Sequence, residues 1–177
     1  MLQCYDPAIN GKMAKRIATD GIFIALALIF SFVESLIPFN FGVPGIKLGL
    51  ANIVIVTGLY YMKLTDVCLI SLVRIVISSL LFGNLMALIY SLAGGVLSLA
   101  VMVLLKRTDK FSVTGVSMAG GVFHNVGQIL AAMAVTGVPV IAYYLPVLMV
   151  TGLLTGAVMG FISGRVLILF VNNRKEI

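Results

Sequence analysis

Long apolar runs, most of them near the length of a membrane-crossing helix, alternate with short polar breaks along the chain. A crossing helix needs about 20 apolar residues, and shorter runs are tolerated. Prolines, glycines and charged residues mark the breaks, because they end helices or resist burial in lipid. The pattern predicts an all-α integral membrane protein, a single membrane domain over 1–177 with six transmembrane helices at 16–37, 46–62, 66–82, 85–105, 112–136 and 142–171.

The break between the first two runs, residues 38–52, holds two prolines, three glycines and two asparagines. It also places Lys47 and Asn52 at or just inside the start of the second run. One interpretation is a roof over a polar pocket, formed by residues 39–45 where the chain re-enters the membrane. The other is an ordinary connecting loop with a snorkelling lysine. The pocket is favoured because polar residues of other runs fall at a similar depth.

Composition excludes a soluble catalytic domain. The chain is 61% apolar and 10% charged, whereas soluble domains average about 45–50% and 25%. The net charge of +6 fits basic loops of a membrane protein better than nucleic-acid binding. Cys4 and Cys68 are too few and too far apart for a metal site or a disulfide framework. No cofactor is expected, and the bilayer itself is the one certain partner of such a chain.

The distribution of basic residues predicts the orientation. If the N-terminus lies in the cytoplasm and the six helices alternate, only Lys47 falls outside and only Arg74 falls within the membrane. Lysine and arginine accumulate on the cytoplasmic side of membrane proteins. We therefore expect both termini in the cytoplasm, in the cytoplasmic membrane of a bacterium. The basic residues placed inside are Lys12, Lys15, Arg16, Lys63, Lys106, Arg107, Lys110, Arg165, Arg174 and Lys175.

With this orientation, the polar residues of the spans lie in the outer half or near mid-depth, while the inner half is almost purely apolar. A polar set that stops at mid-depth describes a cavity open to the outside and not a continuous channel. The candidate ligand-binding residues are Glu34, Lys47, Asn52, Arg74, Asn84, His124, Asn125, Gln128 and Tyr143.

Arg74 and His124 each allow two interpretations. A charge at a helix centre is costly, so Arg74 needs a partner. That partner is either Glu34, in a structural ion pair, or the carboxylate or phosphate of a ligand. His124 and Gln128 lie four residues apart and share a helix face, with Asn125 off that face. The histidine either bonds across helices or contacts the ligand.

Two stripes of small residues are candidate contact faces. Such residues let membrane helices approach closely. The first stripe comprises Ala14, Ala18, Gly21 and Ala25, and the second comprises Gly152, Gly156, Gly160 and Gly164. The second is explained either by packing within the protein or by docking of a partner. We take Ala14, Ala18, Gly21, Ala25, Gly152, Gly156 and Gly160 as candidate partner-docking residues.

Motifs of several enzyme classes are missing from the sequence. There is no Gly-x4-Gly-Lys-Ser/Thr loop, so ATP hydrolysis by this chain is not expected. The six acidic residues are dispersed, so no aspartate-rich cluster can hold magnesium against a diphosphate. Nothing resembles a catalytic triad. We expect a protein that is not itself an enzyme and has no metal site.

Four short motifs carry a resemblance to a known family. They are Ile46–Asn52 (Ile-Lys-Leu-Gly-Leu-Ala-Asn), Ser91–Gly95 (Ser-Leu-Ala-Gly-Gly), His124-Asn125 with Gln128, and Tyr143–Pro146 (Tyr-Tyr-Leu-Pro). Across nearly its whole length the chain resembles the heptaprenyl diphosphate synthase component I family, also called the Gx transporter family. That family in turn resembles the substrate-binding S components of energy-coupling factor (ECF) transporters.

The resemblance implies a function of one of two kinds. An S component would be a six-helix bundle that binds a small, partly anionic solute from outside, docking a transmembrane T protein and two ATPases through small residues of its first helix. A vitamin, a flavin or a prenyl diphosphate would suit an arginine-containing pocket. Alternatively, the synthase name implies a non-catalytic membrane subunit of heptaprenyl diphosphate synthase, serving menaquinone side-chain synthesis.

Overall fold

The computed structural model describes residues 7–36 and 49–173, and every regular element within these ranges is helical. The elements are α1 (Pro7–Leu36), α2 (Leu50–Tyr61), α3 (Leu64–Phe82), α4 (Leu85–Arg107), α5 (Val113–Thr136), the 3₁₀ helix η1 (Pro139–Tyr144) and α6 (Leu145–Asn173). The all-α class predicted from the apolar runs is confirmed.

Five of the six predicted spans correspond to long apolar helices, and the count of six stays a prediction. Within the described ranges, five helices are long and apolar enough to cross a membrane, which fits a multi-pass membrane protein. The exception is α2, whose 12 residues rise only about 18 Å at about 1.5 Å each, well short of a hydrocarbon core of about 30 Å. The predicted helix began earlier, at residue 46, because the apolar run is nearly continuous over 46–62. In the structure the helix begins after Gly49, whose backbone is left-handed (φ 70°).

Other boundaries moved by a few residues for local reasons. Helix α1 begins at Pro7, because the polar lead before Arg16 is itself helical. Helix α5 begins after Ser112, whose hydroxyl accepts a hydrogen bond from the Gly115 amide and caps the helix. The sixth helix begins at Leu145, because η1 occupies the residues directly before it.

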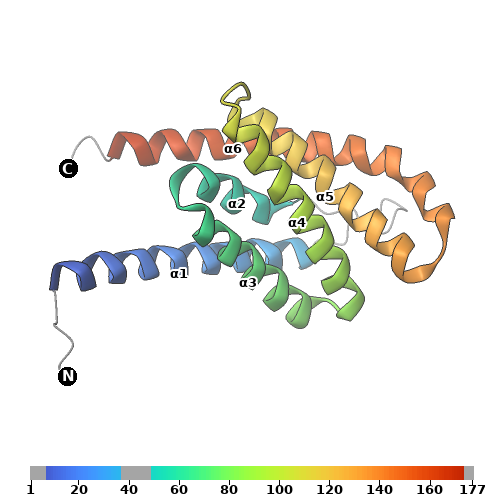
Figure 1. Cartoon of the computed structure of the whole chain (residues 1–177), viewed down its shortest axis with the longest axis horizontal. Helices are drawn as coiled ribbons and strands as arrows, with labels where there is room; N and C mark the ends of the chain where they lie inside the picture. The colour runs from blue at the N-terminus through green and yellow to red at the C-terminus, as the bar shows by residue number, and fades with distance from the viewer. Residues whose placement is uncertain (1–6, 37–48, 174–177) are drawn as a thin grey trace.

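Helices α1 and α6 run in opposite directions across the molecule (Figure 1). The Pro7 end of α1 and the Asn173 end of α6 lie on the same side of the view. Between them, α2 occupies the interior: seven of its twelve residues are buried. Its Val54, Val56 and Leu59 pack with Phe23 of α1 and Ile70 of α3 in one hydrophobic core. This short helix is thus enclosed largely by protein.

Glycines bring the backbones of α4, α5 and α6 into direct contact. A Cβ atom added to Gly121 of α5 would lie 2.3 Å from the carbonyl oxygen of Gly152 of α6. One added to Gly156 would lie 2.7 Å from the Ser117 carbonyl, and one added to Gly94 of α4 would lie 2.6 Å from that of His124. Small residues therefore set the spacing of these three helices, as expected for packing within lipid.

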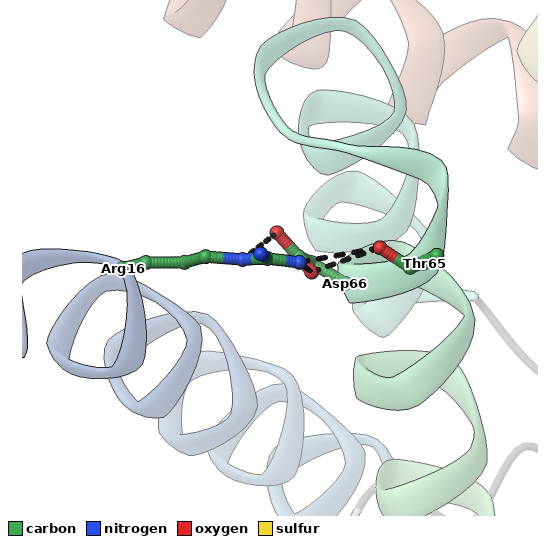
Figure 2. Close-up of polar contacts among 3 residues, drawn as sticks. All are labelled: Arg16, Thr65 and Asp66. Atoms are coloured by element: carbon green, nitrogen blue, oxygen red, sulfur yellow. Dashed lines mark hydrogen bonds and ion pairs between the residues drawn. The ribbon is translucent and has the colours of Figure 1, made fainter. Parts of the chain in front are cut away.

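An ion pair joins α1 to α3 (Figure 2). The Arg16 guanidinium forms two hydrogen bonds to the Asp66 carboxylate: Nε donates to Oδ2 at 3.0 Å, and Nη2 donates to Oδ1. The same Nη2 reaches the Thr65 hydroxyl at 3.3 Å. Asp66 is buried, so its charge is matched by a bidentate partner. Arg16 and Asp66 lie fifty positions apart, so the local sequence indicates no contact between them.

The orientation itself stays a prediction, which cysteine labelling can test. Thr108, in the α4–α5 turn, and Val138, before η1, are both exposed. In a variant without Cys4 and Cys68, Thr108→Cys should react with an impermeant maleimide only after the cytoplasmic face is opened, and Val138→Cys should react in intact cells. Labelling of Thr108→Cys in intact cells would show that the orientation is the opposite of the predicted one. A third suitable site, Asn40, lies outside the described residues.

Candidate functional site

All six α-helices contribute to the lining of one cavity of about 280 Å³. Its wall carries six of the nine predicted ligand-binding residues, from α1, α2, α3 and α5. They are Glu34, Asn52, Arg74, His124, Asn125 and Gln128. Residues far apart in sequence are therefore gathered around a shared space, and their role as ligand contacts stays a prediction.

Arg74 supplies the positive charge of this cavity. It lies near the middle of α3, and its Nε is shielded from solvent without a hydrogen-bond partner. The Glu34 carboxylate acts on it electrostatically. An unpaired N–H of a guanidinium in a shielded cavity favours an incoming anion, because the planar fork can form parallel bonds to a carboxylate or phosphate.

Glu34 has a structural task besides its charge. Its Oε1 accepts a hydrogen bond of 2.6 Å from the Gly49 amide, the residue that precedes the first turn of α2. The left-handed backbone of Gly49 suits glycine, and a carboxylate at a helix N-terminus is favourable. Glu34 thereby joins the end of α1 to the start of α2 at the cavity wall. The two interpretations of Arg74, an ion pair with Glu34 and a ligand clamp, are compatible in this arrangement.

The three polar residues of α5 have different neighbours. Asn125 Nδ2 donates a hydrogen bond to the Leu148 carbonyl of α6, which ties this side chain to the neighbouring helix. His124 and Gln128 lie on the face that packs over Gly94 of α4, where a side chain in place of glycine would meet both. Gly94 thus leaves the room in which these two side chains reach the cavity wall.

Two predicted ligand residues that the structure describes, Asn84 and Tyr143, are not among the residues that border the cavity. Asn84 caps α4, its side chain accepting a hydrogen bond from the Ala87 amide at 2.8 Å. Tyr143, on η1, is 83% exposed and is not among the lining residues. The helix cap accounts for the polar side chain of Asn84, and Tyr143 lies outward on the 3₁₀ helix; a ligand-binding role for either residue stays a prediction. Lys47 and the predicted roof, 39–45, lie outside the described residues.

Small hydroxyl side chains add to the wall and were missed from the sequence, apart from Ser91, which was seen only as part of a mildly polar helix face. They are Ser31, Ser35, Ser78, Ser79, Ser91 and Thr155. Serine and threonine are tolerated in membrane helices because they bond to their own backbone, so they give little signal alone. Spacing offered one clue: Ser78 follows Arg74 by four residues and therefore shares its helix face.

The two small-residue stripes have different surroundings. Gly152, Gly156 and Gly160 contact α5, where an added Cβ would lie 2.7 Å from Asn125, Ser117 and Thr114 atoms respectively. Packing within the protein therefore accounts for these three glycines, and docking of a partner on them stays a prediction. Ala14, Ala18, Gly21 and Ala25 are all exposed on α1, and docking there stays a prediction.

The fold and the cavity define a class, a helical membrane protein with a polar, arginine-containing pocket enclosed by its helices. The family model described as heptaprenyl diphosphate synthase component I matches residues 23–166. The chain belongs to this family, because the match covers most of its length and includes at least part of each cavity-bordering helix. Searches among curated proteins and among solved structures gave no match.

Proposed function

We propose that the protein is a non-catalytic membrane component of polyprenyl diphosphate synthesis that binds a ligand with an anionic group at Arg74. Membership of the heptaprenyl diphosphate synthase component I family is the observation that carries the metabolic assignment. The shielded guanidinium in a cavity with amide, imidazole and hydroxyl groups supports the anion. Prenyl diphosphates have such a group, and the dispersed acidic residues argue for a catalytic centre on another chain.

A deletion strain tests this assignment. Without the protein, membranes should form less long-chain prenyl diphosphate from labelled isopentenyl diphosphate, and the menaquinone pool should fall. Wild-type protein should restore both, whereas Arg74→Gln should restore them incompletely. Arg107→Gln, at the exposed end of α4, is the matched control and should complement fully. Unchanged prenyl products in the deletion strain would refute the proposal.

A second candidate is the substrate-binding component of an ECF-type transporter. The exposed stripe Ala14, Ala18, Gly21 and Ala25 on α1 favours it, since small residues on an outer helix face suit a close contact with another membrane protein. The deletion strain separates the two candidates. A transporter component predicts normal prenyl products together with loss of ATP-dependent uptake of one solute, and restoration of that uptake would fail in Gly21→Leu.

A further inference from the structure

A row of cavity-lining side chains on α3 runs from the charged interior to the surface. Arg74, Ser78 and Phe82 are spaced four residues apart, so they follow one face of the helix, and all three border the cavity. The rise from Arg74 to Phe82 is about 12 Å at about 1.5 Å per residue. The cavity therefore has a polar inner end at the guanidinium and an aromatic end where α3 terminates.

The aromatic end is an apolar mouth. Phe82 is 42% exposed, and its ring lies 5.3 Å from that of Phe32 of α1, which is 44% exposed. Around the α3–α4 turn, Leu81 and Leu85 are also strongly exposed. An exposed apolar surface on a membrane protein suits contact with acyl chains, so an exit past Phe82 would bring an apolar tail to lipid.

Size decides how a ligand can occupy this space. The volume of about 280 Å³ lies just below the usual range for small-molecule pockets, about 300–1,000 Å³. A long polyprenyl chain cannot coil inside it, and the serine, amide and arginine lining would be left without hydrogen-bond partners if it did. The cavity suits a compact polar head, and an attached apolar chain must lie elsewhere.

We propose that the ligand is an amphiphile whose anionic head lies at Arg74 while its apolar tail leaves past Phe82 into the bilayer. This inference rests on the proposed anion site and adds the tail, its exit and the residue that contacts it. Phe82 is then a specificity-determining residue: it selects ligands with a tail over equally charged ligands without one.

The chain has no tryptophan, so Phe82→Trp introduces a single fluorophore at the proposed exit. In lipid nanodiscs, farnesyl diphosphate should shift its emission, and inorganic diphosphate should not. Phe111→Trp, in the exposed α4–α5 loop, is the control and should respond to neither probe. Equilibrium dialysis with wild-type protein should show farnesyl diphosphate binding at least about tenfold tighter, because the bilayer holds its tail beside the mouth.

Two variants separate the head from the tail. Phe82→Ala should weaken farnesyl diphosphate binding several-fold and leave inorganic diphosphate unchanged, whereas Arg74→Gln should weaken both. Equal affinities of wild-type protein for the two probes would contradict the proposed tail contact at Phe82 and would leave the anion site standing. Absence of binding by either probe would overturn the anion site as well. Farnesol binding as tightly as farnesyl diphosphate would overturn the role of the anionic head.

Discussion

Arg74→Gln is expected to weaken binding of farnesyl diphosphate by roughly 1.5–3 kcal/mol, the scale of a hydrogen bond to a charged group. That corresponds to about tenfold to a hundredfold in Kd. Glutamine keeps a donor and much of the length but loses the charge and the fork. Arg74→Lys should recover only part of the loss, because an ammonium cannot form parallel bonds to one phosphate. Equilibrium dialysis on protein in nanodiscs measures both variants.

Thermal melting of the same samples is the necessary control, since Arg74 also interacts electrostatically with Glu34. Arg107→Gln makes the same chemical change at an exposed position and should alter neither affinity nor melting temperature. If Arg74→Gln melts early yet its folded fraction binds like wild type, Arg74 is a structural partner of Glu34 and the anion site is wrong.

Gly156→Leu should destabilise the protein by at least roughly 3 kcal/mol, the upper part of the range for overpacking a tight contact. Its Cβ would lie 2.7 Å from the Ser117 carbonyl oxygen and 2.8 Å from the Met118 Cα. Both obstacles are backbone atoms, so no rotamer change relieves them and α5 must move away from α6. Size-exclusion chromatography and melting in detergent measure the effect.

Gly164→Leu is the matched control on the same helix, because nothing lies within 4 Å of a Cβ added there. It should melt like wild type or slightly higher, since leucine favours helix over glycine. A Gly156→Leu variant that is folded and as stable as wild type would mean that the α5–α6 contact is looser than described. A folded variant that no longer forms a complex would support the partner-docking interpretation of this glycine.

Apolar periodicity and the cost of burying polar groups were sufficient to predict the helices and the convergence of Arg74 with His124 and Gln128. A buried arginine restricts the alternatives, because it must meet other polar groups within lipid. The lysine and arginine bias gives an orientation that only labelling will test. The position of α2 was not predictable in the same way: its hydropathy equals that of a spanning helix, and Gly49 looks like any other loop glycine in the sequence.

Contacts between residues far apart in the chain also could not be predicted from the sequence. Arg16 and Asp66 each suit an interfacial position alone, and nothing in their local sequence indicates that they meet. The glycines of α6 gave a clear pattern, but small residues spaced by four suit an internal neighbour and an external partner equally well. The close approach of Gly156 to Ser117 accounts for that glycine by internal packing, and that information is three-dimensional.

The glycine contacts among α4, α5 and α6 also bear on the order in which the chain assembles during membrane insertion. These three helices are consecutive, and the close contacts of Gly94, Gly121 and Gly156 lie between them, although Gly95 of α4 also meets Ile75 of α3. We expect them to associate as a preformed platform. Because α3 precedes them in the chain, we expect Arg74 to gain polar neighbours only after α5 has brought His124 and Gln128 to the cavity wall.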